Sequence, residues 1–198
     1  MFKIGITGGI GSGKTSVCKV FGVLGIPVFS SDTAGREIMD IDTGIILKLN
    51  SIAGKNLYPG GTLDRAELAR LIFNNPYMLE KVNSVVHPAV FSRFSEWEKK
   101  QHAPYVIMEA AIFFENGGSK KVNRVITVTA PVEERIARVM RRNNLTKEQV
   151  MERIRNQMSD ADMAKQSDYV IDNSENTMII PTVLNIHEDI LKSANQFC

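Results

Sequence analysis

The chain has 198 residues, of which 43% are hydrophobic and 23% are charged. This length and composition allow one folded α/β domain with an insertion, and they exclude two full enzyme domains and a disordered chain. The net charge of +2 argues against a general nucleic-acid binder, and no apolar run approaches the ~20 residues that cross a bilayer. Cys18 and Cys198 form no metal-ligand or disulfide pattern, and the chain opens on a strand-like run with no separate signal segment, so a cytoplasmic protein is expected.

The first predicted elements form a strand–helix–strand unit. Residues 3–7 read as a short strand, and a glycine-rich stretch leads from it into a helix from about residue 14 to residue 24. Gly25 ends this helix, and residues 27–29 begin a second strand. This alternation favours a parallel sheet with helices on its faces.

The middle of the chain, from about residue 33 to residue 100, is predicted to be almost wholly helical. Asp64 and Glu67 predict a helix start with a reciprocal cap, and Pro76 and Pro88 are expected to separate further helices. We therefore expect a helical insertion between strands of the sheet.

Strand patterns return in the last part of the chain. Near-continuous apolar runs, typical of parallel strands buried on both faces, occupy residues 105–108, 124–128 and 169–171. Two helices are expected between the last two runs, one starting at Pro131 and one at Thr146, where Thr146 and Gln149 form a capping box. A closing helix is predicted from about residue 177 to residue 195.

A phosphate-binding pattern occupies residues 8–15, which fit G-x-x-x-x-G-K-[ST] without a mismatch. Glycines let backbone N–H groups approach phosphate oxygens, and the loop opens a helix whose N-terminus carries partial positive charge. Lys14 is expected to reach the β- and γ-phosphates, and the Thr15 hydroxyl to bind magnesium. A strand before and a helix after disfavour the alternative of a glycine-rich turn that binds nothing. The ATP-binding residues expected in this segment are Gly9, Gly11, Ser12, Gly13, Lys14, Thr15 and Ser16.

Two acids follow predicted strands, whose carboxyl ends line the ligand crevice of a parallel sheet. Asp32 could accept the proton of an attacking hydroxyl or help to hold magnesium, or it could be the N-cap of a helix that starts at Thr33. Glu109 could be linked to magnesium, or it could be a half-buried acid paired with a base. The pattern leaves both choices open.

Three basic residues are further candidates. His87 precedes a proline, a setting that fits a loop residue as well as a site residue. Arg138 and Arg142 are neighbours on one helix face and could clamp a transferring phosphoryl group. The alternative is a solvated basic face, and the phosphate loop on the same chain favours the clamp.

At these positions the chain resembles the dephospho-coenzyme A kinase family over nearly its whole length. The phosphate loop is shared with many kinases, but the ordered set of motifs is more specific. Ser30-Ser31-Asp32 with Arg36 resembles D-A-D-x-x-x-R, residues 61–65 resemble G-x-L-D-R, His87-Pro88 resembles H-P, residues 109–115 resemble D-x-P-L-L-x-E, and Arg138, Arg142, Gln157 and residues 168–173 complete the series.

The resemblance implies an α/β fold: a P-loop NTPase three-layer sandwich with a parallel five-stranded sheet. Within a single kinase domain (residues 1–198) it implies a helical substrate insertion at about residues 33–100 and a lid at about residues 138–165. It also implies transfer of a phosphoryl group from MgATP to the ribose 3′-hydroxyl of dephospho-coenzyme A, the last step of coenzyme A synthesis. The expected partners are ATP, dephospho-coenzyme A and Mg²⁺, with no nucleic acid, membrane or obligate protein partner.

Residue roles follow from the same resemblance. The catalytic set would be Lys14, Asp32, Arg138 and Arg142. The substrate-binding set would be Thr7, Asp32, Arg36, Asp64, Arg65 and His87. Arg138, Arg142 and Asn173 would join the loop in binding ATP, with Asp168 near its adenine end. Magnesium would be held by Thr15, with Asp32 and Glu109 as further candidates.

Three departures from the family pattern stand out. Ser30 replaces the first acid of D-A-D, which leaves Asp32 as the remaining candidate. Residues 111–113 replace P-L-L, which should change packing more than chemistry. Arg135 stands where an uncharged residue such as Gln is expected, which puts the lid contacts in question.

Two other functions stay open. The acceptor could be another small alcohol, such as a nucleoside, a nucleotide or shikimate. The chain could instead be a nucleotide switch, but it contains no N-K-x-D base-reading motif. Within the insertion, Leu68, Ile72 and Phe91 could contact the pantetheine arm or belong to the core.

Overall fold

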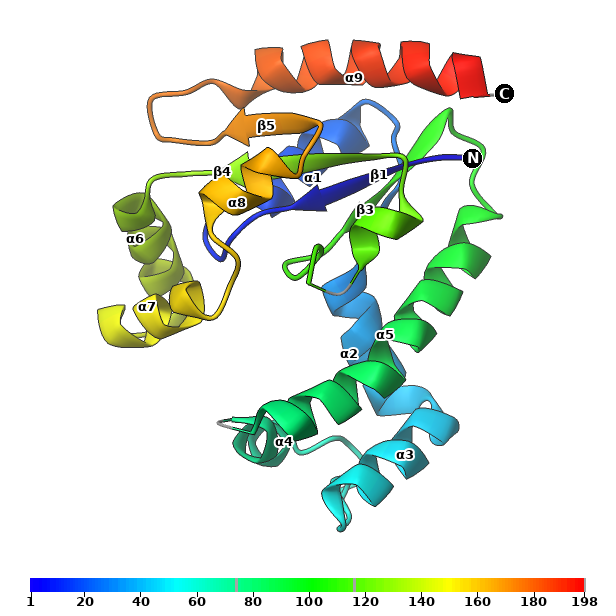
Figure 1. Cartoon of the computed structure of the whole chain (residues 1–198), viewed down its shortest axis with the longest axis vertical. Helices are drawn as coiled ribbons and strands as arrows, with labels where there is room; N and C mark the ends of the chain where they lie inside the picture. The colour runs from blue at the N-terminus through cyan, green and yellow to red at the C-terminus, as the bar shows by residue number, and fades with distance from the viewer. Residues whose placement is uncertain (74, 116, 198) are drawn as a thin grey trace. The chain divides into compact units, whose positions relative to one another are not determined.

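The computed structural model describes residues 1–73, 75–115 and 117–197, so Cys198 lies outside the described residues. The chain forms two compact units, one made of residues 1–30 with the chain from Lys100 onward, and one made of residues 31–99. The first unit contains the sheet and the second is helical (Figure 1). The helical unit is inserted in the sequence between the second and third strands of the sheet.

Within the described residues, five strands form one sheet in the order β2-β3-β1-β4-β5. Their bounds are β1 Phe2–Thr7, β2 Val28–Ser30, β3 Tyr105–Glu109, β4 Arg124–Thr129 and β5 Tyr169–Asp172. Every neighbouring pair is parallel, which confirms the predicted sheet. Because the strands run in one direction, their carboxyl ends meet at one edge, where the residues after β1 begin the phosphate loop.

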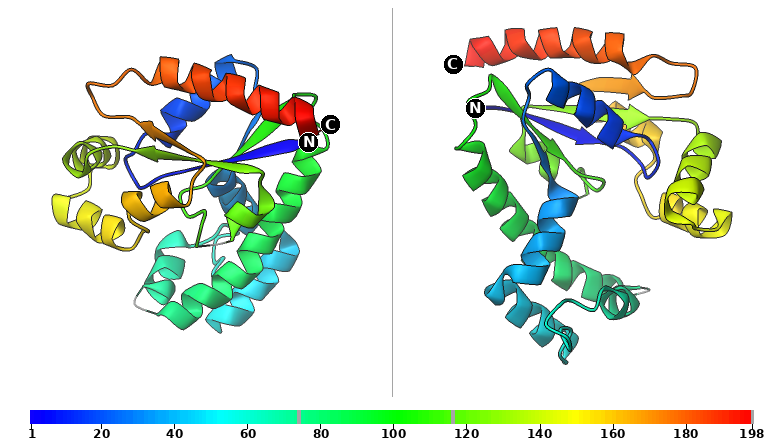
Figure 2. Two further views of the ribbon diagram at one scale, coloured as in Figure 1. Left: turned by 45° about the horizontal axis from the view of Figure 1, so that its top comes forward. Right: turned by 180° about the vertical axis from the view of Figure 1, so that it is seen from behind.

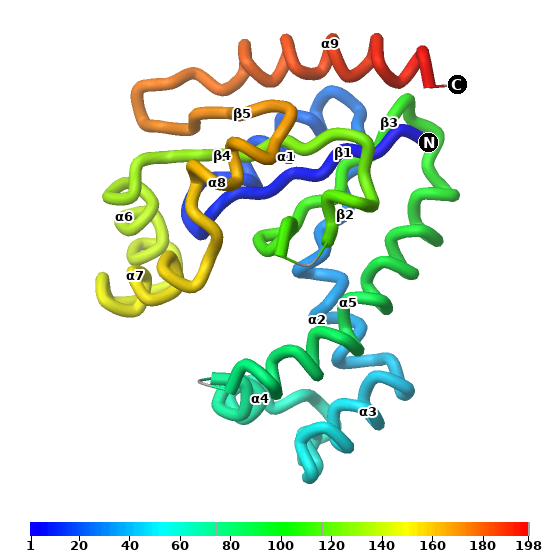
Figure 3. The backbone as a smooth tube through the Cα atoms, in the orientation of Figure 1, coloured from blue at the N-terminus to red at the C-terminus, as the bar shows by residue number. Residues whose placement is uncertain are grey.

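Helices cover both faces of this sheet. Helices α1 and α9 lie on one face and α8 on the other (Figure 2). The bounds in this unit are α1 Lys14–Val23, the 3₁₀ helix η1 Gly118–Lys121, α6 Val132–Asn143, α7 Lys147–Arg155, α8 Asp160–Lys165 and α9 Ile179–Phe197. After β4 the chain passes through α6, α7 and α8 before it re-enters the sheet as β5 (Figure 3). Helices α6 and α7 were predicted from the sequence, whereas the short helix α8 was not.

An apolar cluster joins α1 and α9 to the sheet. Ile4 and Ile6 of β1 are fully buried, and α1 and α9 pack onto them with residues at helical spacing. These contributions are Val17 and Phe21 from α1, and Val183, Ile186 and Ile190 from α9. The cluster fixes β1 at its centre, and with β1 it fixes the start of the phosphate loop.

The helical unit contains α2 Ser31–Ile41, α3 Thr43–Ala53, α4 Arg65–Ile72 and α5 Pro76–Glu98. The prediction that Pro88 separates two helices is wrong, because α5 continues through it. A proline inside a helix costs about 3 kcal/mol, whereas each fully buried apolar side chain contributes ~1.5–3 kcal/mol. Helix α5 buries a stripe of four such residues that spans the proline: Val82, Val86, Val90 and Phe94.

Two predicted helix starts can be compared with the structure. Thr146 and Gln149 form the complete capping box at the start of α7. At α4 only half of the predicted cap forms: the Asp64 carboxylate accepts from the Glu67 N–H at 2.9 Å, but the Glu67 carboxylate binds Arg70 and Lys55 instead. Hydrogen bonds from these two cations lower the pKa of Glu67 to about 2, and the bond from Arg70 has the larger effect.

In the part of the chain that the structure describes, no helix combines the length and apolar character required for a membrane span.

Candidate functional site

The phosphate loop connects β1 to α1 and ends at Gly13, the N-cap of α1. Gly13 has a φ of +94°, and a β-carbon there would lie 1.9 Å from Nδ2 of Asn173. Both the backbone conformation and the space at this position therefore require glycine. The result is a tight entry into α1, whose N-terminal N–H groups can bind an anion.

Lys14 places its charge on the loop itself. The side chain is buried, and Nζ donates to the carbonyl oxygens of Gly8 at 2.7 Å and Gly9 at 3.4 Å. The Ser12 hydroxyl is also buried, and no described residue hydrogen-bonds to it. A phosphate oxygen could become the missing partner of Ser12. Thr15 and Ser16 are exposed in the first turn of α1.

Three side chains from elsewhere in the unit bind the loop backbone. Gln157 accepts from the N–H of Ile10 at 2.8 Å, and Arg135 Nε donates to the carbonyl of Ile10 at 2.9 Å. Asn173 Nδ2 donates to the carbonyl of Ser12 at 2.8 Å. Asn173 was expected to bind ATP, and the structure places it directly against the phosphate loop. The loop contacts of Arg135 and Gln157 were missed, since no local pattern marks bonds across 125 and 147 residues.

The two arginines expected to clamp phosphate lie in different surroundings. Arg138 Nη2 donates to Glu134 Oε2 at 2.8 Å and to the carbonyl of Asn173 at 2.9 Å. Its Nη1 is buried and has no hydrogen-bond partner among the described residues. Arg142 is exposed near the end of α6, where Nε donates to Asn143. The structure therefore brings Arg138, but not Arg142, to the residue that holds the phosphate loop.

Glu109 lies at the carboxyl end of β3, in register with Ile6 of β1 and Ser30 of β2. The Ser30 hydroxyl donates to Glu109 Oε2 at 3.1 Å. This bond explains how Ser30 fits at the position where the family pattern has an acid. Burial raises the pKa of the Cys18 thiol to about 12, with the Glu109 charge adding to the rise and Lys14 opposing it. Glu109 and Lys14 thus act on the same buried sulfur at the base of the loop.

The donor set around the loop suits magnesium. No group of three or more His, Cys, Asp or Glu that could hold a metal is found within the described ranges. Magnesium at nucleotide sites usually needs only one or two protein oxygens, because phosphates and water supply the rest. The exposed Thr15 hydroxyl, with the Glu109 carboxylate on the adjacent strand end, fits that chemistry.

Asp32 belongs to the helical unit and lies in the first turn of α2. The interpretation of Asp32 as an N-cap is wrong, because α2 already begins at Ser31. Its carboxylate is exposed, and no hydrogen bond or ion pair to it occurs among the described residues. Arg36 is also exposed, one turn further along the same helix. An unpaired acid two residues after β2 is available for a ligand.

The other expected substrate residues of the helical unit make contacts within it. Arg65 Nη2 donates to Asp40 Oδ2 at 2.7 Å and to the carbonyl of Arg36 at 3.3 Å. Asp64 caps α4, so one of its oxygens is used by the backbone. His87 is half-buried inside α5, and burial lowers the pKa of its imidazole. The structure thus links Arg65 to Arg36 but gives Asp64 a role in helix α4.

Two further expected positions lie in the first unit. Thr7 is fully buried, so a substrate contact there requires the hydroxyl to become exposed on binding. Asp168 lies at the amino end of β5, where it accepts from Arg124 and from the N–H of Val125. Asn173 follows the opposite end of β5, roughly 15 Å of strand away. The expectation that Asp168 and Asn173 both lie near the adenine end of ATP stays a prediction, and the structure separates the two residues by the length of β5.

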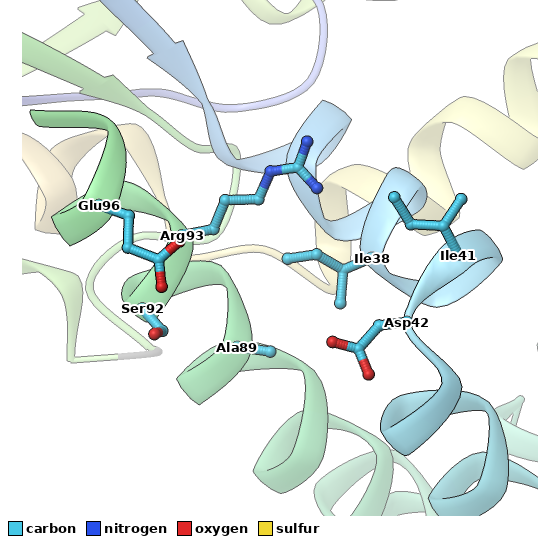
Figure 4. A pocket seen from close by; sticks show the side chains of 7 residues that line it. All are labelled: Ile38, Ile41, Asp42, Ala89, Ser92, Arg93 and Glu96. Carbon is cyan, nitrogen blue, oxygen red and sulfur yellow. The ribbon is translucent and has the colours of Figure 1, made fainter. Parts of the chain in front are cut away.

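A pocket of about 520 Å³ lies within the helical unit, between α2 and α5 (Figure 4). It is lined by Ile38, Ile41, Asp42, Ala89, Ser92, Arg93 and Glu96. Asp42 caps α3, and Arg93 pairs with Glu37 at 2.7 Å, so these polar groups already have partners. At 100° per residue, Ile38 and Ile41 lie on the side of α2 away from Asp32 and Arg36. The pocket is separate from the expected substrate residues.

The three apolar candidates for contact with the pantetheine arm differ in their exposure. Leu68 is buried, at 8% exposure, which fits the core interpretation. Ile72 and Phe91 are half-buried, so their side chains are partly accessible.

Comparison with known proteins gives one family. The model of the dephospho-CoA kinase family matches residues 2–178. A dephospho-CoA kinase from Bacteroides fragilis is 36% identical over 197 residues, which are 99% of this chain and 96% of the relative. A dephospho-CoA kinase from Thermus thermophilus is 36% identical over 175 residues, covering 86% of this chain and 82% of the relative.

Solved structures share the fold of this chain. A crystal structure from Thermus thermophilus superimposes with a TM-score of 0.83 at 33% identity, and 97% of each chain is covered. A dephospho-CoA kinase from Campylobacter jejuni gives a TM-score of 0.68 at 24% identity, over 96% of this chain and 98% of that chain. A shikimate kinase from Acinetobacter baumannii gives a TM-score of 0.51 at 16% identity, over 98% of this chain and 94% of that chain, and shares the fold. The P-loop NTPase fold expected from the sequence is thereby confirmed.

Proposed function

Because the chain belongs to the dephospho-CoA kinase family, we propose that it transfers the γ-phosphoryl group of ATP to the ribose 3′-hydroxyl of dephospho-coenzyme A. The products are coenzyme A and ADP. The observation that carries this proposal is the phosphate loop, which is held at the carboxyl edge of the sheet with Lys14 on its carbonyls. Such a loop supplies the electrostatic stabilisation on which phosphoryl transfer depends.

The nucleotide is bound by the loop amides, the Ser12 hydroxyl and the Lys14 ammonium. When a triphosphate enters, Lys14 exchanges its bonds to Gly8 and Gly9 for bonds to the β- and γ-phosphates. Thr15 and Glu109 would hold Mg²⁺, which supplies charge neutralisation and orientation of the phosphates. Arg138, whose Nη1 lacks a partner among the described residues, provides a second cation for the transferring group.

The acceptor is positioned by residues of the helical unit. Asp32 is exposed and unpaired in the described structure, and it aligns the attacking ribose hydroxyl and accepts its proton. Because the transition state of phosphoryl transfer is loose, alignment contributes more than removal of the proton. Arg36, Arg65 and His87 bind the remaining charged and polar parts of the substrate. The Arg65 guanidinium already lies against Arg36, because it donates to the backbone carbonyl of that residue.

The segment at about residues 138–165 acts as a lid. Arg138 is held at Asn173 beside the loop, and closure of the lid brings the exposed Arg142 to the phosphates as well and excludes water that would otherwise accept the phosphoryl group. Residues 31–99 form a separate compact unit, which serves as the substrate domain.

The test is an ADP-release assay with MgATP and one candidate acceptor per reaction: dephospho-coenzyme A, adenosine, AMP or shikimate. Turnover only with dephospho-coenzyme A, at a kcat within the ~1–10³ s⁻¹ typical of enzymes, is the expected result. Preference for shikimate or a nucleoside would replace the proposed acceptor. ATP binding without turnover of any acceptor would favour a nucleotide switch.

A further inference from the structure

We propose that Arg135, through its pair with Asp160, is a positioning residue that holds the phosphate loop at Ile10 and links the loop to the start of α8. The inference rests on the proposed function only in that the loop binds ATP. Neither residue was assigned a role from the sequence, where Arg135 was recognised only as a departure from the family pattern.

Ile10 is the loop residue whose N–H and carbonyl are both bonded to side chains from outside the loop. Its N–H donates to Gln157, and its carbonyl accepts from Arg135. Its side chain packs on the apolar cluster that joins α6 to α7, formed by Ile136, Val139 and Val150. Because the Ile10 N–H already donates to Gln157, it is not available to a phosphate. Its position is set by α6 and by the segment that follows α7.

Arg135 lies directly against the loop. The residue is 3% exposed. A β-carbon on Gly9 would lie 2.0 Å from Arg135 Nη2, and one on Gly11 would lie 2.6 Å from the Arg135 carbonyl oxygen. Glycine at these two positions therefore lets α6 approach the loop closely, in addition to any role in approaching phosphate. The guanidinium and the loop backbone cannot move independently without losing this packing.

Asp160 balances the buried charge. Arg135 Nη1 donates to both carboxylate oxygens of Asp160, at 2.8 and 2.9 Å. An unpaired buried charge is costly, so the guanidinium needs this partner. Asp160 is the first residue of α8, three positions after Gln157. Residues 157–160 therefore act on both backbone groups of Ile10. Gln157 accepts from the N–H directly, and Asp160 pairs with Arg135, which donates to the carbonyl.

The arginine adds a link that an uncharged residue would lack. A glutamine at position 135 could donate to the Ile10 carbonyl without any need for Asp160. With arginine, displacement of residues 157–160 breaks both bonds to Ile10 or moves the loop with the segment. Phosphoryl transfer is sensitive to small misplacements of the groups around the phosphates. The pair therefore acts on ATP and on the chemical step rather than on the acceptor.

The test compares Arg135→Gln, Asp160→Asn and the double variant Arg135→Gln/Asp160→Asn with the wild type. Each is assayed for kcat, for the KM of ATP and for the KM of dephospho-coenzyme A, and thermal midpoints are recorded. Arg141→Gln is the matched control, because Arg141 is an exposed arginine of the same helix. Binding of a non-hydrolysable ATP analogue, measured by calorimetry without acceptor, gives a readout that does not depend on turnover.

Each single variant leaves one charge of the pair without its partner. We expect kcat/KM for ATP to fall roughly tenfold to hundredfold, the analogue to bind more weakly, and the KM of dephospho-coenzyme A to stay unchanged. The double variant removes both charges and should regain most of the loss. Where Arg135→Gln does not fold, Arg135→Lys keeps the charge pair but loses the Nε donor to Ile10, and the same split in KM is expected.

Two outcomes would overturn the inference. One is a loss that affects both KM values equally and follows the thermal midpoint, which would indicate a purely structural pair. The other is a double variant no better than the worse single variant. If the wild type binds the analogue but does not phosphorylate dephospho-coenzyme A, the proposed function fails, and the binding data still decide the role of Arg135.

Discussion

The phosphate loop and the helical unit hold their candidate residues in different ways. Around the loop, side chains bind backbone groups far away in the sequence: Asn173 binds Ser12 across 161 residues, and Arg135 binds Ile10 across 125. In the helical unit, Asp64 caps its own helix and Asp32 has no bond to a described residue. On the proposed function, the nucleotide side is therefore fixed by folding, whereas the acceptor side keeps Asp32 available for a ligand.

The largest effect should come from the nucleotide side. Replacing Lys14 by Met removes the cation that lies on the loop carbonyls and should lower kcat by roughly 10³-fold, as expected for loss of a preorganised charge at a developing anion. Steady-state kinetics with saturating ATP would measure this. The fold should persist, because the Met side chain can fill the same buried space. A variant that keeps a tenth of the activity would show that Lys14 does not contact the transferring group.

On the acceptor side, Asp32→Asn should lower kcat by roughly 10²-fold with little change in either KM. Asp32 is exposed, so stability should be unaffected. The matched control is Glu37→Gln, an exposed acid further along the same helix. Equal losses in kcat and in binding of dephospho-coenzyme A would mean that Asp32 only binds the substrate.

The two arginines of α6 give a sharper form of the comparison. Arg138→Ala should lower kcat by roughly tenfold to hundredfold, because Arg138 is held at Asn173 beside the loop. Arg142→Ala should have a smaller effect, since Arg142 is exposed and its side chain donates a hydrogen bond to its neighbour Asn143 rather than to the loop or to Asn173. The ratio of the two kcat values is the quantity to measure. A larger loss at Arg142 would show that lid closure, rather than the contacts seen here, selects the phosphate ligand.

The smallest effect should be on stability, at the start of α4. Asp64→Ala removes the N-cap and should lower the free energy of unfolding by about 1 kcal/mol, whereas Asp64→Asn keeps an acceptor and should cost little. Chemical denaturation of the two variants would show the difference. If both fold normally but lose affinity for dephospho-coenzyme A, the substrate role expected for Asp64 is supported alongside its capping role.

Local signals in the sequence predicted much of this structure. The strands, the loop and the capping box at Thr146 depend on neighbouring residues, so spacing and residue type were sufficient to place them. From the sequence, a break was predicted at Pro88, but α5 continues through it. The packing that compensates for the proline comes from other helices, and no local pattern reveals it. The reciprocal cap at Glu67 failed for a related reason, since Lys55 and Arg70 compete for its carboxylate.

The candidate site was predictable only where a motif carried it. The loop and Lys14 follow from their pattern, but the bonds to Ile10 join segments that no spacing rule connects. In the sequence, Ser30 was recognised only as a replacement for an acid of the family pattern. The structure shows that its hydroxyl donates to the Glu109 carboxylate. Asp168 was placed by resemblance, and its ion pair with Arg124 lies at the other end of β5.

The most direct test of the account is to locate the phosphorus in the product. Wild-type protein would be incubated with MgATP and dephospho-coenzyme A, and the product analysed by two-dimensional ¹H–³¹P correlation NMR. The account predicts stoichiometric ADP and a new phosphomonoester signal coupled to the ribose H3′. ADP released with inorganic phosphate and no new ester, or a phosphoryl group attached at another hydroxyl, would contradict it.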